Sequence, residues 1–219
     1  MVQPSIISYI AMMLKPKKNF LITGFLNGYI AWIIRRHFKK VHFNTPDFDS
    51  DQSILLIANH YSWWDGFILY HINRLYFKKN FHTMVLEETM QKVGIFKYLG
   101  GFSVAKNSKQ VLEALSFAAG LLNDGNNMVV IFPQGKLHSN FVDVVGFEKG
   151  VFRIAAQAKP DFQYVFAASF TENFEHKEPS VFCSLTVFHS NDFTTLEELR
   201  KAYQQHYMAA KTTQTNITI

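Results

Sequence analysis

The sequence has very little cysteine, and its single thiol, Cys183, has no partner for a disulfide within these 219 residues. A fold held together by disulfides is therefore excluded. Cys183 lies in an apolar run at 180–185, which predicts a small, buried strand residue and fits a reducing compartment such as the cytoplasm. Charged residues are also scarce, at 18%, whereas hydrophobic residues reach 48%, so a generally disordered chain is excluded as well.

Several local sequence patterns are missing too. The chain has no G-x-x-x-x-G-K-[ST] loop and no G-x-G-x-x-G segment, so nothing in it supports a nucleotide-binding site. Its nine histidines do not fall at the spacings of metal ligands, and we expect neither a metal nor another cofactor. The length suits one domain, with at most a small appendage.

The charge that is present is mainly positive, because 22 Lys and Arg residues against 17 Asp and Glu residues leave a net charge of +5. An excess of this sign favours an anionic partner, which is a membrane surface, a nucleic acid or a phosphorylated substrate. The basic residues gather beside the N-terminal apolar runs and do not interleave with aromatic residues in an RNA-binding motif. We therefore expect no nucleic-acid partner.

The first 44 residues contain two apolar runs, at 5–14 and 20–34, each followed by Lys or Arg residues. Neither run has the ~18 to 20 apolar residues needed to cross a bilayer, and the charges follow the first run, which predicts no secretory signal. Two apolar helices flanked by cations favour a peripheral, amphipathic motif on the anionic cytoplasmic face of the cell membrane, with Tyr29 and Trp32 at the interface. The alternative is that these helices cover part of the globular core.

Beyond residue 44, short apolar runs alternate with amphipathic segments. The predicted strands span 53–58, 81–86, 102–105, 128–132, 163–170 and 180–189, and the predicted helices 64–74, 88–99, 108–122, 148–158 and 196–208. This order predicts an α/β fold with a mixed, largely parallel sheet flanked by helices. The chain is thus divided into membrane-associating helices over 1–44, an α/β domain over 45–211 and a polar tail over 212–219.

The first candidate catalytic stretch follows the strand at 53–58, at the sheet edge where such folds place their sites. His60 and Asp65 are five positions apart, and a bend between them brings the carboxylate to the imidazole. A carboxylate on one ring nitrogen stabilises the imidazolium and leaves the other nitrogen as a general base that deprotonates a substrate hydroxyl. The alternative is a helix-capping box starting at Ser62, in which Asp65 serves only the backbone.

The second candidate stretch comprises Phe132, Pro133, Gln134, Gly135 and Lys136, and follows the predicted strand at 128–132. A strand that stops at proline and turns at glycine leaves backbone N–H groups and the lysine ammonium exposed. Such groups can hold an anionic oxygen. The alternative is an ordinary exit from a strand into a loop.

A third stretch starts at Gly100-Gly101 and ends in Lys106, and the three together resemble the glycerolipid (lysophospholipid) acyltransferase family. The signatures of that family are N-H-x-x-x-x-D, G-G-x-x-x-x-R and F-P-E-G-T-R-S, in this order. The chain has Asn59-His60 with Asp65, then Gly100-Gly101 with Lys106, then F-P-Q-G-K-L-H-S at 132–139. Order and spacing agree, and the resemblance covers roughly 52–170.

This resemblance implies an enzyme that transfers a fatty acyl group from acyl-CoA or acyl carrier protein to a hydroxyl of a lysolipid-like acceptor, without an acyl-enzyme. It implies that His60 is the general base and that Asp65 orients it and stabilises its charge. It also implies that Lys106 and the residues at 132–136 bind the acceptor's polar head or the developing oxyanion. The family's amphipathic N-terminus supports the membrane interpretation.

The chain departs from the family at three places, with Gln134 for Glu, Lys136-Leu137 for Thr-Arg and Lys106 for Arg. Lysine keeps the charge of arginine but lacks the bidentate fork that suits phosphate. We therefore expect weaker phosphate recognition, so an aminolipid, a glycolipid or a pigment-linked lipid is an alternative acceptor, and a catalytically degenerate homologue is an alternative protein. A serine hydrolase is disfavoured, because the segment starting at Gly101 lacks the last glycine of G-x-S-x-G.

Overall fold

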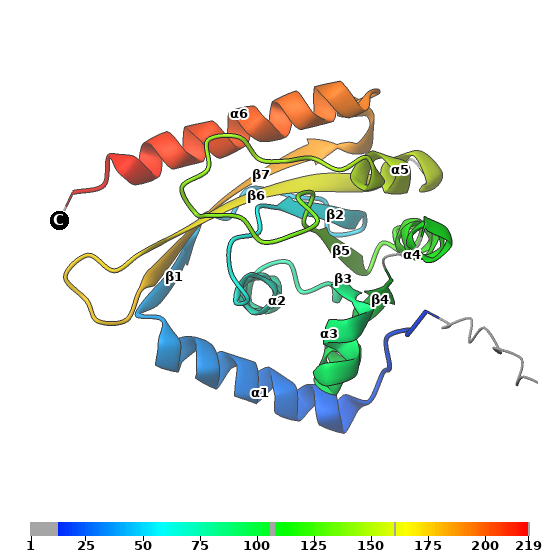
Figure 1. Cartoon of the computed structure of the whole chain (residues 1–219), viewed down its shortest axis with the longest axis horizontal. Coiled ribbons are helices and arrows are strands. Elements are labelled where there is room, and N and C mark those ends of the chain that lie inside the picture. Colours follow the sequence, from blue (N-terminus) through cyan, green and yellow to red (C-terminus); the bar gives the residue numbers. More distant parts are fainter. Residues whose placement is uncertain (1–12, 106–107, 160, 219) are drawn as a thin grey trace, which may run out of the picture.

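A central sheet with helices on both faces forms the body of the computed structural model, which describes residues 13–105, 108–159 and 161–218 (Figure 1). Its seven strands lie in the order β1-β7-β6-β2-β5-β3-β4. They are β1 (Lys40–Phe43), β2 (Ser53–Ala58), β3 (Asn80–Leu86), β4 (Gly101–Val104), β5 (Asn127–Ile131), β6 (Phe162–Glu172) and β7 (Ser180–His189). Every neighbouring pair is parallel except β6 and β7, which confirms the prediction of a mixed, largely parallel sheet.

The helices divide between the two faces of this sheet. They are α1 (Phe20–His37), α2 (Asp65–Leu75), α3 (Glu87–Lys92), the 3-10 helix η1 (Gly94–Leu99), α4 (Ser108–Leu121), α5 (Gly150–Gln157), the 3-10 helix η2 (Ser190–Asp192) and α6 (Leu196–Thr215). Helices α1 and α2 pack on one face, and α4, α5 and α6 pack on the other (Figure 1). The predicted helix at 88–99 is in fact two short segments, α3 and η1, because the chain turns at Val93.

The strand β2 sits inside the sheet and contributes to both cores, which explains its run of apolar residues. Leu55 and Ile57 point toward α4 and α6, whereas Ile54 and Leu56 point toward α1 and α2. A fully buried side chain of this size contributes about 1.5–3 kcal/mol relative to an exposed one. Cys183 in β7 is 4% exposed, as predicted, and burial raises the pKa of its thiol to about 12.

The described part of the first predicted helix, Met13 and Leu14, is not helical and bonds to the sheet instead. Residues 1–12, and with them most of the first predicted helix, lie outside the described residues, but Met13 and Leu14 are not helical. Leu14 instead pairs with the outer strand β4, because its N–H donates to Ser103 Oγ at 2.7 Å and its carbonyl accepts from Ser103 N–H at 2.9 Å. Within the described residues, no helix is long and apolar enough to cross a membrane.

The prediction that 1–44 contains only amphipathic helices is wrong for β1, which pairs in parallel with β7 from Lys40 to Phe43. The strand was hidden because it is four residues long and begins at the end of a basic run. The second predicted helix is confirmed as α1, which begins after Asn19, whose side chain accepts a hydrogen bond from Ile22 N–H at 3.1 Å.

At the other end of the chain, α6 continues to Thr215, so the first four residues of the predicted polar tail are helical. The hydroxyls of Thr212, Thr213 and Thr215 donate to backbone carbonyls three or four residues earlier, and Gln214 is 8% exposed. Threonine lacks the apolar signal that marks a helix in a sequence, which is why the prediction ended at Met208.

Candidate active site

The first side chain after β2 fixes the direction in which the chain leaves the sheet. Asn59 is 4% exposed, and its amide bridges to the neighbouring strand β6 by two hydrogen bonds. Its Nδ2 donates to the carbonyl of Ser169 at 2.9 Å, and its Oδ1 accepts from Ser169 N–H at 2.8 Å. The sequence analysis noted Asn59 in the motif but gave it no role. In the structure, its two hydrogen bonds to Ser169 fix the backbone just before His60.

His60 and Asp65 form a hydrogen-bonded pair at the carboxyl end of β2. The imidazole Nδ1–H donates to Asp65 Oδ2 at 2.7 Å, with the His60 side chain 24% exposed and the Asp65 side chain 3% exposed. The same oxygen accepts from the backbone N–H groups of Tyr61 at 2.8 Å and Ser62 at 2.9 Å. Asp65 therefore bonds to the imidazole and to the backbone at once, and its catalytic role stays a prediction.

Hydrogen bonds within the turn and to strand β6 fix the backbone bend between His60 and Asp65. Helix α2 begins at Asp65 itself, and Ser62 Oγ accepts from Trp64 N–H at 3.1 Å, so Ser62 does not cap the helix as expected. The Tyr61 hydroxyl lies 2.8 Å from Thr171 Oγ1 on β6. Burial, with a smaller contribution from the Asp65 carboxylate, raises the pKa of Tyr61 well above its usual value, so the phenol stays neutral.

The second candidate stretch surrounds His60 from the neighbouring strand β5. The Phe132 ring stacks on the imidazole with 4.1 Å between ring centroids. Gln134 Oε1 accepts from His60 N–H at 2.6 Å, and His138 N–H donates to the His60 carbonyl at 2.9 Å. The turn needs a positive φ of 66° at Gly135, which glycine adopts without strain.

A cavity of about 500 Å³ adjoins this pair. His60, Phe132, Gly135 and Lys136 line it, whereas Pro133 and Gln134 are buried and do not. Most of the remaining lining is apolar and includes Trp63, Phe67, Tyr70, Phe81, Phe96 and Leu99.

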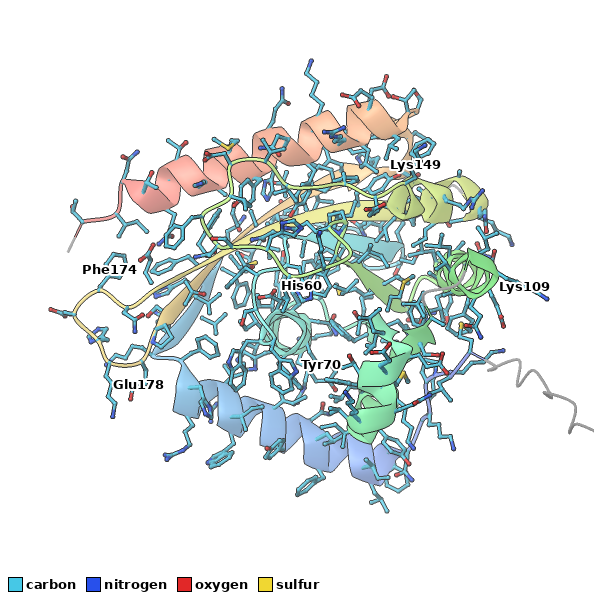
Figure 2. All side chains as sticks on the ribbon, viewed as in Figure 1. His60, Tyr70, Lys109, Lys149, Phe174 and Glu178 are labelled. Carbon is cyan, nitrogen blue, oxygen red and sulfur yellow. The ribbon has the colours of Figure 1, made fainter. Side chains whose placement is uncertain are left out.

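Helix α2 and the turn just before it form one side of this cavity. Tyr70 of α2 and His60 are labelled in Figure 2. Trp63, Gly66, Phe67 and Tyr70 recur at helical spacing and all line the cavity, and a Cβ on Gly66 would meet no atom within 4 Å. The sequence did not identify these residues as a groove, although their spacing was the available signal. Any helix that packs on a core has the same spacing of apolar residues. Only the three-dimensional arrangement therefore distinguishes a helix that lines a cavity from one that packs on the core.

The third candidate stretch serves packing, as far as the structure describes it. Gly100 has a φ of +86°, and a Cβ there would lie 1.7 Å from the carbonyl oxygen of Phe81. Only glycine fits at such a close approach of two backbones. Lys106 lies outside the described residues, so the structure does not place this predicted substrate-binding cation.

The chemistry of the site follows from these neighbours. One imidazole nitrogen is bonded to a buried carboxylate, and the ring lines a largely apolar cavity in which Lys136 supplies an exposed cation. This arrangement suits removal of a proton from a hydroxyl beside a long apolar group. In the three described segments of the chain, no group of three or more His, Cys, Asp or Glu residues is placed to hold a metal ion.

Comparisons with known proteins show the family and the fold of this chain. The model of the protein family described as Acyltransferase matches residues 39–169. The fold is similar to the crystal structure of the 1-acyl-sn-glycerophosphate (LPA) acyltransferase PlsC from Thermotoga maritima, with a TM-score of 0.59 and 16% sequence identity over 90% of this chain and 83% of that chain. No curated protein sequence matches this chain significantly.

Proposed function

This chain belongs to the acyltransferase family and is an acyltransferase, and from this premise we propose that it moves a fatty acyl group from acyl-CoA or acyl carrier protein to a hydroxyl of a lysophospholipid-like acceptor. The observation that carries the proposal is the His60–Asp65 pair, joined at 2.7 Å, beside a largely apolar cavity of about 500 Å³. The volume and the lining suit a fatty chain, and the imidazole supplies a base where the chain would end.

In the proposed reaction, the free imidazole nitrogen of His60 takes the proton of the acceptor hydroxyl. The hydroxyl oxygen attacks the thioester carbonyl carbon, and the tetrahedral intermediate collapses with cleavage of the C–S bond. The thiolate then takes the proton from the imidazolium, so the products are an ester and a free thiol. Asp65 stabilises the positive charge that the ring carries in between.

The polar head of the acceptor is proposed to lie beside Lys136, at the same end of the cavity as His60 and Gly135. Lys136 is the only Lys or Arg among the described residues that line this cavity, and it acts on phosphate as a point charge. Because Lys136 alone supplies positive charge among these lining residues, we expect phosphate to be recognised weakly. An acceptor without phosphate, such as an aminolipid or a glycolipid, therefore stays a second candidate.

An assay with defined substrates tests the proposal. The purified chain is supplied with labelled palmitoyl-CoA or palmitoyl carrier protein and, in separate reactions, with lysophosphatidic acid, a lyso-aminolipid and a lysoglycolipid. Ester formation with at least one acceptor, faster than in a reaction without protein, is the expected result. Failure with both donors and every acceptor would favour the catalytically degenerate alternative.

Helix α1 is the proposed contact with the membrane. Its inner face is buried against the body, but its outer face exposes large apolar side chains, which are Phe20, Leu21, Phe25, Tyr29 and Trp32. Next to Trp32, a hollow of about 400 Å³ is lined by Arg35, Arg36 and Lys39 and by one acid, Glu178. Apolar rings followed by cations fit the interface and the anionic headgroups of the cytoplasmic leaflet.

Changing this outer face is expected to weaken vesicle binding. In the variant Phe25→Ser/Trp32→Ser, we expect the fraction bound to phosphatidylglycerol vesicles to fall several-fold in a sedimentation assay, because two exposed aromatic side chains no longer enter the interface. Met208→Ser on α6, which covers the opposite face of the sheet, is the matched control and should bind like wild type. Equal binding by all three proteins would contradict the assignment of α1.

A further inference from the structure

Three contacts hold His60 from a segment more than seventy residues away in the chain. Phe132 stacks on its imidazole, Gln134 accepts its backbone N–H at 2.6 Å, and His138 donates to its carbonyl at 2.9 Å. The backbone donor and acceptor of residue 60 are thus both bonded to the loop between β5 and α5. The position of the imidazole therefore depends on this loop as well as on Asp65.

Within this loop, Gln134 is the residue whose side chain bonds to the backbone of His60. It is 5% exposed and does not line the cavity. Because a backbone N–H is always a donor, the atom that faces His60 is the amide oxygen. Its amide oxygen is engaged with the His60 N–H, and the residue does not line the cavity, which does not fit the expectation that Gln134 binds the acceptor.

We propose that Gln134 is a positioning residue, which holds the backbone of His60 so that the imidazole stays between Asp65 and the acceptor hydroxyl. The inference rests on the proposed role of His60 as the base. Leaving the His60 N–H without an acceptor is unfavourable, and a shift of the backbone would partly relieve the loss. A displacement of about 1 Å in a reacting group can cost on the order of 10²-fold in rate.

The neutrality of this amide has a second consequence. The titratable groups nearest His60 are Asp65 at the start of α2, Tyr61 beside it, and Lys136 and His138 in the loop. Behind them, Cys183 in β7 and Tyr203 in α6 lie near Asp65, and Glu148 before α5 lies near Gly135. Tyr61 and Cys183 are neutral, because burial raises the pKa of both. Among the described residues, Asp65 is the carboxylate bonded to the ring. A glutamate at 134 would add a second negative charge close to it and favour the protonated imidazole.

Two variants at this position separate the contributions of shape and charge. Gln134→Met keeps the length of the side chain but removes the acceptor, and we expect kcat to fall by about tenfold or more, with KM for the donor nearly unchanged. Gln134→Glu keeps an acceptor oxygen, so we expect kcat to recover at high pH. Its added charge should move the acid limb of the kcat/KM profile to higher pH by about 0.5–1 unit.

Gln204 on α6 provides a matched control, because it also bonds to this loop but at a distance from His60. Its Oε1 accepts from Val145 N–H at 3.0 Å and its Nε2 donates to the Asp143 carbonyl at 2.6 Å. We expect Gln204→Met to keep kcat and the pH profile of wild type. Thermal unfolding of each variant verifies that it is folded.

The proposal is overturned if Gln134→Met turns over like wild type, if Gln134→Glu is as slow as Gln134→Met at every pH, or if Gln204→Met slows the enzyme as much. The role of His60 as the base is tested separately, by the activity of His60→Ala. If His60→Ala stays active, the proposed function loses its base. If His60→Ala is inactive and the Gln134 variants behave like wild type, only the positioning role is lost.

Discussion

Replacing His60 with alanine is expected to lower kcat for ester formation by at least ~10²-fold, the effect of removing a general base from a proton-transfer step. The imidazole lines the cavity, is bonded to Asp65 through Nδ1 and is packed against Phe132, which is the placement that the proposed base requires. The comparison is made by initial rates at saturating donor and acceptor, with wild-type protein at the same concentration.

A histidine outside the site supplies the control for this variant. His176 is exposed on the hairpin between β6 and β7, and His176→Ala should keep the wild-type rate. A rate within threefold of wild type for His60→Ala would remove the imidazole from the mechanism, and the cavity would then need another base. Retained thermal unfolding behaviour in both variants ensures that the rate reports on chemistry.

Replacing Asp65 with asparagine is expected to have the second largest effect, a loss of about 10²-fold or more in kcat. Asparagine keeps one oxygen for the backbone N–H groups of Tyr61 and Ser62 but carries no charge. The imidazolium formed during the reaction then has no counter-charge. For the same reason, the acid limb of the kcat/KM profile should move to lower pH, the reverse of the shift expected for Gln134→Glu.

Comparing Asp65→Ala with Asp65→Asn separates the contribution of this carboxylate to stability from its contribution to the rate. It leaves the N–H groups of Tyr61 and Ser62 without their partner, at about 1–3 kcal/mol for each donor that stays buried. We therefore expect a lower midpoint of thermal unfolding for Asp65→Ala than for Asp65→Asn, while both are slow. An asparagine variant with the wild-type rate and pH profile would mean that Asp65 only supports the backbone.

Much of the fold was accessible from the sequence because the sheet is buried on both faces. The strand at 53–58 was predicted with the boundaries of β2, since all six of its residues are buried and all but Ser53 are apolar. The strand β1 was missed because it begins at the exposed Lys40, at the end of a basic run, and its other three residues are only half-buried. Periodicity identifies elements that bury many side chains and fails for those held mainly by backbone hydrogen bonds.

The site was predicted in part, for a related reason. Motif spacing brought His60 and Asp65 together correctly, and the structure places Phe132, Gly135 and Lys136 on the same cavity. The part played by Gln134 was out of reach, because a side chain bonded to a distant backbone leaves no pattern in the sequence. The apolar cavity was equally hidden, since most of its residues come from α2, β3 and η1 and meet only after folding.

The short strand β1 limits where the chain can be cut. It pairs along β7 from Lys40 to Phe43, so a fragment that starts at residue 45 would leave four residues of β7 without their hydrogen-bonding neighbour. Such an uncovered edge recruits strands from other molecules, and aggregation is its usual result. Fragments meant to keep the catalytic part alone should therefore retain residues 40–43, even where α1 is removed.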